Sequence, residues 1–239
     1  MEEKECDRNQ PKKLLMAIVS QGSKKVSQEI LIDALWPEES LKASKKNFKT
    51  TLQRLRKSLE PMIDKEFSSS YVHLRDNFIF LDPELCEVDA DLFLSLLKKG
   101  GEKEKKGDIN GTLSSYAEAT EMYKGDFLLE EVYAPWADMK REDLKGKYVE
   151  VLNHMAKLYE KKGASTKAIA WYKKIIQADP FSEESYQNLM ALYSNRGRLN
   201  EAVRTYEACK KVFEISFKTK PDPTTNALYK KILEKIHST

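Results

Sequence analysis

One stretch of the chain carries basic side chains at a spacing that suits the binding of an anionic partner. Residues 44–60 read SKKNFKTTLQRLRKSLE, with no acidic side chain before Glu60. A solvated helix normally interleaves cations with carboxylates, because like charges at i,i+4 repel by roughly a few tenths of a kcal/mol per pair. A helix whose cations have no neighbouring carboxylates is suited to bind the phosphates of a nucleic acid. The plainer interpretation is a basic surface helix without a target.

Helical winding divides this stretch into two faces. The apolar residues fall on one narrow stripe that we expect to face a core: Phe48, Leu52, Leu55 and Leu59. The opposite face presents Lys46, Thr50, Gln53, Arg54 and Lys57. Such a helix can position its cations only if other elements cover the apolar stripe, so the flanking sequence must supply a small core.

The overall composition shows that any anion-binding surface must be local. The chain has 239 residues, of which 41% are hydrophobic and 33% charged, yet its net charge is only +3. The chain as a whole is therefore not a polycation. Its length is sufficient for two domains, each with its own hydrophobic core. The three cysteines, Cys6, Cys86 and Cys209, are odd in number and far apart, which favours reduced thiols over a disulfide framework. With no apolar run of membrane-spanning length and no signal peptide, we expect a soluble, cytoplasmic protein.

Two shorter helices precede the basic one. Pro11 is expected to open the first helix, which Gly22 ends. Ser27 is a natural N-cap for the second helix, and Pro37 should end that helix at Trp36, because the residue before proline avoids the α region. We interpret Trp36 as a core residue rather than a binding-site aromatic.

A β-hairpin is predicted after the basic helix. Residues 69–82 read SSYVHLRDNFIFLD, with Asp76 and Asn77 at the tip of a tight turn, since both residue types tolerate left-handed conformations. Arg75 lies beside this tip. Helix, helix, basic helix and hairpin in that order is the plan of a winged helix, in which the third helix, about residues 44–59, enters the major groove.

The run LIDALWPEESLKASKKNFKTTLQRLRKSLEP resembles the OmpR-type winged helix of the Streptomyces antibiotic regulatory protein group. The residues that carry this resemblance are Leu31, Leu35, Trp36, Pro37, Leu55, Arg56, Lys57 and Leu59. The resemblance implies that the outward positions of the basic helix lie near DNA, namely Lys46, Thr50, Thr51, Gln53, Arg54 and Arg56. Helical winding places Arg56 toward a flank, which still suits a phosphate contact.

The DNA-binding residues can be given separate roles. Arg54 and Gln53 are the candidates for base edges, because Arg pairs with guanine and Gln with adenine. Lys46, Lys49 and Lys57 would contact phosphates and set the register of the protein on the duplex. The predicted DNA-binding set is Lys46, Lys49, Thr50, Thr51, Gln53, Arg54, Arg56, Lys57 and Arg75.

The sequence departs from the OmpR-type pattern in two places. Such domains begin with a small sheet, but only ten polar residues precede Pro11. The chain is therefore expected to be a C-terminal fragment of a larger regulator, or a domain without this sheet. The hairpin tip reads RDNF instead of the glycine-rich tip with tyrosine that many relatives have, which puts DNA contacts by the hairpin in doubt.

The second part of the chain repeats itself. A shift of 34 residues brings one set of residues onto another: Leu158, Tyr159, Gly163, Ala168 and Tyr172 onto Leu192, Tyr193, Gly197, Ala202 and Tyr206. This period resembles the tetratricopeptide repeat. A fainter copy contains Gly107, Thr112 and Tyr116. We interpret Asp89 and Asp91 as helix-opening acids, and KKGGEKEKKGD as a solvated helix end or loop.

With the front half, this array resembles the bacterial transcriptional activator domain. The resemblance is carried by YKGDFL, PWADMKREDL, DPFSEESYQNLMALYSNRGRLNEAVRTYE and PDPTTNALYKKI, and with the winged helix it covers nearly all of residues 11–236. The expected fold is mainly α: a winged helix-turn-helix with a small β-hairpin over residues 1–84, then a tetratricopeptide-like helical domain over residues 85–239. The aromatic residues Trp136, Trp171 and Tyr172 are expected to pack between helices.

The residue pattern does not favour catalysis. His73, His154 and His237 are isolated, no two cysteines have metal-ligand spacing, and no glycine-rich phosphate loop is present. Cys86 and His73 could meet across the hairpin, although a buried thiol beside a surface histidine is the commoner arrangement. We expect no catalytic residue, metal or cofactor.

Two functions remain open. The first is a sequence-specific DNA-binding transcriptional activator, whose partners are double-stranded DNA and, by hypothesis, RNA polymerase or a second copy on direct repeats. The second is a protein-interaction adaptor that works through the helical repeats and carries a degenerate winged helix. The salt dependence of DNA binding distinguishes them.

Overall fold

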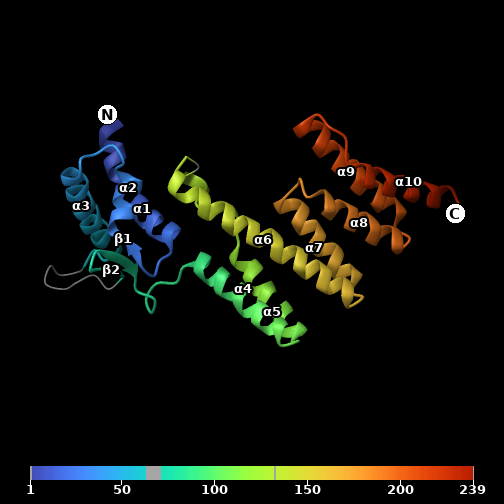
Figure 1. Cartoon of the computed structure of the whole chain (residues 1–239), viewed down its shortest axis with the longest axis horizontal. Helices are drawn as coiled ribbons and strands as arrows, with labels where there is room; N and C mark the ends of the chain where they lie inside the picture. The colour runs from blue at the N-terminus through green and yellow to red at the C-terminus, as the bar shows by residue number, and fades with distance from the viewer. Residues whose placement is uncertain (1, 63–70, 132, 239) are drawn as a thin grey trace. The chain divides into compact units, whose positions relative to one another are not determined.

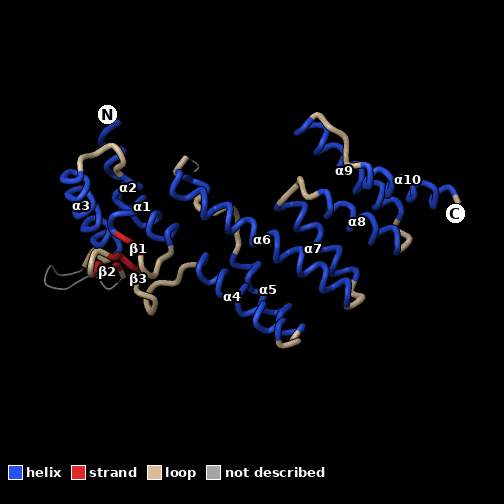
Figure 2. The backbone as a smooth tube through the Cα atoms, viewed as in Figure 1, coloured by secondary structure: helices blue, strands red, loops and turns tan. Residues whose placement is uncertain are grey.

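The computed structural model describes residues 2–62, 71–131 and 133–238, with side chains from residue 9 onward. The chain forms two compact units, Met1–Leu96 with Glu121–Lys145, and Leu97–Thr120 with Gly146–Thr239. Helices make up most of both units, and the strands all belong to the first (Figures 1 and 2). These units differ from the predicted division after residue 84, because Val88 and Trp136 pack against the core of the first unit.

Three helices open the first unit: α1 (Glu2–Gln21), α2 (Gln28–Leu35) and α3 (Leu41–Leu59). The prediction that Pro11 opens α1 is wrong, because the helix begins nine residues earlier and Pro11 lies inside it. The Ser27 side chain caps α2 by accepting a hydrogen bond from the Glu29 amide, as predicted. Trp36 ends α2 and is only 8% exposed, which confirms it as a core residue.

A three-stranded antiparallel sheet completes this part: β1 (Val26–Ser27), β2 (Val72–Arg75) and β3 (Phe78–Leu81), in the order β1-β3-β2. The hairpin between β2 and β3 is confirmed, with Asp76 and Asn77 at φ 50° and 65° in its turn. The strand β1 was not predicted. It pairs with β3 through Val26 opposite Ile79 and Ser27 opposite Phe78.

The core of the first unit lies between the sheet and the three helices. Its fully buried members include Leu14, Ile18, Leu31, Phe48, Val72 and Ile79. From α3, Phe48, Leu52 and Leu55 are buried as predicted. Leu59 is 38% exposed, so the predicted apolar stripe ends at Leu55, one turn before the helix does.

The rest of the first unit contains the start of α4 (Asp89–Lys105), the short 3-10 helix η1 (Leu129–Glu131) and the start of α6 (Pro135–Lys161). Asp89 and Asp91 lie in the first turn of α4, as predicted. The Arg141 guanidinium donates hydrogen bonds to three main-chain oxygens before α6, those of Phe127 (2.8 Å), Leu128 (3.2 Å) and Glu131 (3.1 Å). This side chain therefore fixes the path of the segment.

All the regular secondary structure described in the second unit is helical. Its complete helices are α7 (Ser165–Ala178), α8 (Glu183–Asn195), α9 (Leu199–Phe217) and α10 (Pro223–His237), and it also includes most of α5 (Ile109–Met122). The predicted repeat is visible in the backbone, because Gly163 and Gly197 end equivalent helices at φ 70° and 71°. The alanines one turn into the following helices, Ala168 and Ala202, are both fully buried.

The fainter repeat copy is also helical. Gly107 has φ 77°, and Thr112 and Tyr116 are buried. The stretch KKGGEKEKKGD contains the end of α4, as the helix-end interpretation predicts, but the helix continues through Gly100 and Gly101 and ends only at Lys105. Packing explains why residue 100 is a glycine, since a Cβ atom there would lie 2.3 Å from the Tyr116 ring. The glycine is needed for a close contact between helices.

Candidate nucleic-acid interface

The helix α3 is rigidly placed and strongly basic. The Ser40 hydroxyl accepts from the Ala43 amide (3.4 Å) at its N-terminus, and Phe48, Leu52 and Leu55 anchor it in the core. Its sequence, LKASKKNFKTTLQRLRKSL, contains seven basic residues and no acidic one. The core contacts and the N-cap therefore determine the orientation of the charged face of α3.

The outer face of α3 carries most of the predicted DNA-binding residues. The structure exposes Lys46, Lys49, Thr50, Gln53, Arg54 and Lys57. Among the side chains that the structure describes, Lys46, Lys49 and Lys57 form no ion pair with a carboxylate. The nearby Glu39 accepts both of its hydrogen bonds from the Asn47 amide, at 2.9 and 2.7 Å. An anion approaching this face therefore meets several available ammonium groups.

Thr51 does not lie on this face. It is 5% exposed and points into the core beside Leu52 and Leu55, because one residue along a helix turns the side chain by about 100°. The prediction of a direct DNA contact by Thr51 is therefore wrong. Its neighbour Thr50 is exposed, and its hydroxyl donates back to the Lys46 carbonyl at 3.1 Å.

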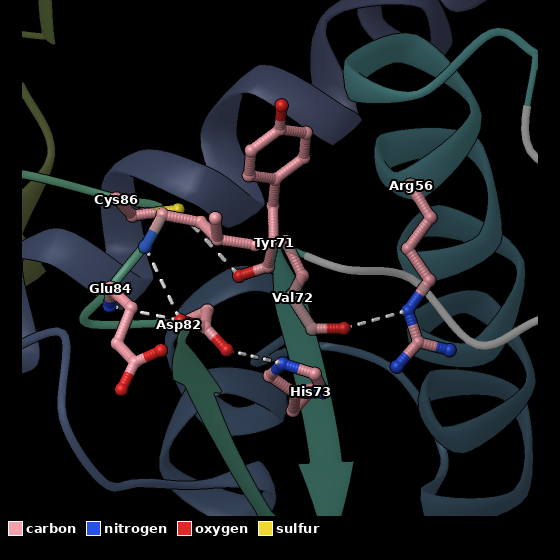
Figure 3. Close-up of polar contacts among 8 residues, drawn as sticks. Arg56, Tyr71, Val72, His73, Asp82, Glu84 and Cys86 are labelled. Atoms are coloured by element: carbon pink, nitrogen blue, oxygen red, sulfur yellow. Dashed lines mark hydrogen bonds and ion pairs between the residues drawn. The ribbon is translucent and has the colours of Figure 1, made fainter.

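Arg56 lies on the flank of α3 and binds the sheet. Its Nε atom donates to the Val72 carbonyl of β2 at 3.0 Å (Figure 3). Burial lowers the pKa of the Arg56 guanidinium from its ordinary value, and the nearby Glu60 carboxylate opposes this effect. The side chain thus joins α3 to the edge strand, which leaves its terminal nitrogens as the groups available for a phosphate.

The hairpin presents Arg75 at its exposed end, with the guanidinium carbon 5.9 Å from the centre of the Phe80 ring. A second cation was missed by sequence reasoning. Lys25, just before β1, places its Nζ atom 4.3 Å from the centre of the Phe78 ring. A two-residue strand gives no recognisable alternation, so the sequence offered no sign that Lys25 and Phe78 meet.

His73 and Cys86 are not partners. The His73 Nε2 atom lies 3.2 Å from a carboxylate oxygen of Asp82, whereas the Cys86 thiol faces the Tyr71 carbonyl at 3.8 Å (Figure 3). A hydrogen bond from the Glu84 amide, helped by His73, lowers the pKa of Asp82. Burial raises the pKa of the Cys86 thiol, which makes it a poor nucleophile. These contacts hold the segment after β3, residues 82–86, against the start of β2.

The described part of the chain offers no grouping of side chains suited to metal binding. Within those residues, no three His, Cys, Asp or Glu side chains are grouped as a metal ion would require. The His154 Nε2 atom is 2.7 Å from the Glu104 carboxylate, and the His154 and Tyr116 rings form a T-shaped contact, so this histidine takes part in packing between helices. The described helices also include none long and apolar enough to traverse a lipid bilayer.

Comparison with known proteins identifies the class. Residues 88–233 match the model of the bacterial transcriptional activator domain, more than half of the chain. The chain therefore belongs to the bacterial transcriptional activator domain family. It is 25% identical over 227 residues to the regulatory protein AfsR of Streptomyces coelicolor; this match covers 94% of the chain and 22% of AfsR.

A solved structure extends the likeness to the first unit. The chain is similar to EmbR of Mycobacterium tuberculosis, solved in complex with a low affinity phosphopeptide, with a TM-score of 0.68 and 19% sequence identity. This match covers 95% of the chain and 59% of the EmbR chain. The fold of EmbR is therefore shared over nearly the whole chain, and the chain spans only part of the length of both proteins.

Proposed function

We propose that this protein is a sequence-specific DNA-binding transcriptional activator, with the first unit acting as a winged helix and α3 as its recognition helix. The observation that carries the proposal is the outer face of α3, where Lys46, Lys49 and Lys57 are exposed without carboxylate partners among the described side chains. Membership of a transcriptional activator family supports it. Such a regulator would act in the cytoplasm, where the DNA lies.

The dimensions of α3 fit this role. From Lys46 to Lys57 the helix advances by eleven residues, about 16 Å along its axis, and an α-helix fits the major groove of B-DNA. The core contacts of Phe48 and the bond from Arg56 to Val72 hold the helix on two sides. A fixed helix loses little conformational entropy on binding, which favours affinity.

Different side chains would read sequence and backbone. Gln53 and Arg54 lie beyond the middle of α3 and are exposed, so they are the candidates for base edges. Lys46, Lys49 and Lys57 would contact phosphates, and the Thr50 hydroxyl would donate to either target only after releasing its hydrogen bond to the Lys46 carbonyl. The flanking Arg56 would contact a phosphate with its terminal nitrogens while its Nε atom remains bonded to Val72.

The helical repeats would supply the second contact of an activator. We infer that they either hold two copies together on direct repeats or bind RNA polymerase, as tetratricopeptide-like arrays present extended surfaces to proteins. Two copies on neighbouring sites would bind cooperatively. A tandem site that is bound no more tightly than a single half-site would contradict self-association on DNA.

The test is selection of bound duplexes from a random pool, followed by fluorescence anisotropy over a series of salt concentrations. If five or so cations face phosphates, log K should fall against log salt with a slope of about −4 to −5, at about 0.9 per phosphate. Lys46→Ala should weaken binding to all sequences alike, whereas Arg54→Ala should also relax the selected consensus.

Lys211→Ala is the matched control, since this lysine is exposed on α9 in the other unit. It should leave affinity and salt slope unchanged. The adaptor function predicts a different result: weak binding to every duplex, no enriched consensus, and no separation between Lys46→Ala and Lys211→Ala. That outcome would refute the assignment of α3.

A further inference from the structure

Three helices of the second unit, α7, α8 and α9, form a groove. The helix α8 packs against both α7 and α9 (Figure 1), and a cavity of about 430 Å³ opens between the three. The floor of this cavity consists of Tyr186, Leu189 and Tyr193 of α8, which are at most 3% exposed. The exposed Ala208 of α9 leaves room above the floor, because its side chain ends at Cβ. We call this floor and the facing sides of α7 and α9 the α7–α9 groove.

The floor of the α7–α9 groove is apolar but carries two hydroxyl groups. Within the described chain, neither the Tyr186 nor the Tyr193 hydroxyl has a hydrogen-bond partner, and neither oxygen is fully buried. Burial raises the pKa of the Tyr186 phenol, so this group stays neutral and keeps a proton to donate. The Arg198 guanidinium carbon lies 4.7 Å from the centre of the Tyr193 ring. The floor thus offers an apolar surface and two hydrogen-bonding groups to a partner.

The sides of the α7–α9 groove are cationic. Lys173 of α7 and Arg204 of α9 are exposed, and among the described side chains neither forms an ion pair with a carboxylate. Glu201 lines the same groove, but Arg198 holds it in an ion pair at 2.7 Å. The bond from Arg198 lowers the pKa of Glu201, with a smaller effect from Arg204. Because α7 has three lysines and no acidic residue, the groove favours a partner that carries carboxylates.

Exposed apolar side chains extend this surface along α9. In the described part of the second unit, the exposed large apolar residues are Phe181, Ile215 and Phe217, at 48, 64 and 51%. Phe181 follows α7 and Phe217 ends α9, and their rings make a T-shaped contact with centroids 4.9 Å apart. Ile215 lies about two helical turns beyond Ala208 and on the same face of α9. From Glu201 to Phe217 the helix advances by sixteen residues, about 24 Å.

We propose that the α7–α9 groove binds an acidic amphipathic helix of a partner protein. The apolar face of that helix would lie on the α8 floor and on the Phe181–Phe217 pair. Its carboxylates would pair with Lys173 and Arg204. An apolar floor is what helix-in-groove recognition requires, and the cations on both sides supply charge complementarity. This binding rests on the protein contact proposed above for the repeats and is independent of DNA binding by α3.

DNA fits the α7–α9 groove less well than such a helix does. A duplex would bring phosphates and sugars onto the side chains of Tyr186, Leu189 and Tyr193, which offer no cation. The exposed phenyl rings at the end of α9 would also stay in water, whereas an apolar peptide face covers them. The chemistry of the surface therefore favours a peptide.

The experiment measures the fluorescence anisotropy of a labelled peptide with the full chain. The peptide has about 15 residues, which span about 22 Å as a helix, with Leu and Phe on one face and Glu on the other. The parent should bind it more tightly than a peptide of the same residues in scrambled order. Lys173→Glu/Arg204→Glu should weaken binding about tenfold, because two attractive pairs become repulsive. Ala208→Trp should weaken it as well, because the indole fills the groove.

Two control variants separate the groove from other basic surfaces. Lys230→Glu reverses an exposed charge on α10 and should keep the parent affinity for the peptide. Lys46→Ala/Lys49→Ala removes charge from α3 and should bind the peptide as the parent does, which excludes capture by the recognition helix. Thermal unfolding checks the fold of every variant, and the groove variants should keep the parent affinity for the selected duplex.

Equal peptide affinity in the parent, Lys173→Glu/Arg204→Glu and Ala208→Trp would overturn this inference. A parent that binds neither peptide, or both peptides alike, would overturn it too. If the groove variants lost affinity for the duplex instead, the surface would belong to DNA and the peptide site would be refuted. A parent that binds the peptide but no duplex would overturn the role of α3 and leave the groove as proposed.

Discussion

Thr50 and Thr51 are neighbours in sequence but lie on different faces of α3: Thr50 is exposed to solvent, and Thr51 is 5% exposed and lies on the core side. Substitutions at the two positions should therefore affect different properties: stability at Thr51 and DNA binding at Thr50. Thr51→Ala should lower the free energy of unfolding by about 1 kcal/mol, because it removes buried atoms. Thr50→Ala should change it by less than about 0.5 kcal/mol and weaken DNA binding. Urea unfolding and anisotropy on both variants check the pair, and equal effects on stability would contradict the orientation of α3.

Gly100 and Gly101 form a second matched pair. Gly100→Ala brings a Cβ atom to 2.3 Å from the Tyr116 ring, so we expect a loss of about 1 to 3 kcal/mol in the free energy of unfolding. At Gly101 the nearest atom, the Tyr116 hydroxyl oxygen, is 3.8 Å away. Gly101→Ala should therefore stabilise α4 by about 0.5 to 1 kcal/mol. If denaturant curves showed the same sign for both, the packing of α4 on Tyr116 would be wrong.

Arg141→Lys should disturb the segment before α6. A single ammonium cannot satisfy the three carbonyl oxygens that the guanidinium binds, and the Arg141 side chain is only 12% exposed. We expect a loss of about 2 to 3 kcal/mol in stability, together with faster amide exchange around η1. Hydrogen exchange read by mass spectrometry provides the measurement. The nearby surface change Lys140→Arg should leave both quantities unchanged.

Cys209 makes stability depend on alkaline pH. Burial raises the pKa of this thiol to about 12, whereas 9.0 is the value of a free thiol. The contribution of the neutral thiol is therefore fully present below pH 9 and is lost as pH rises toward 12. At pH 10 the loss should be about 1 kcal/mol.

The measurement compares the parent with Cys209→Ala, since buried tyrosines also titrate in this range. The difference in free energy of unfolding between the two proteins should narrow from pH 8 to pH 10. Alkylation of Cys209 should become rapid only when urea unfolds the second unit. Rapid alkylation of this residue in the native protein would show that it is accessible.

Local signals in the sequence identified most elements of the fold. Ser27 and Trp36 mark the two ends of α2 because capping and the following proline act through nearest neighbours. Asp76 and Asn77 fix the hairpin for the same reason, since their side chains tolerate positive φ. The outer face of α3 was also predictable, because helical periodicity determines which residues are turned away from a core.

The errors come from contacts between distant residues. Gly100 looked like a helix breaker, but the Tyr116 ring on another helix requires a glycine there. The strand β1 was missed because only its pairing with β3 defines it. The family resemblance implies a DNA contact for Thr51, whereas helical winding places only Thr50 on the outer face. Lys25 could not be assigned before its contact with Phe78 was known.

The three hydrogen bonds from the Arg141 guanidinium to main-chain oxygens have a consequence for sequence divergence within the family. The guanidinium recognises main-chain oxygens of residues 127–131 and none of their side chains. Evolution can therefore exchange those side chains at little structural cost while the arginine keeps the backbone in place. Related chains that retain an arginine at this position could carry quite different amino acids there, and so acquire new surfaces on an unaltered scaffold.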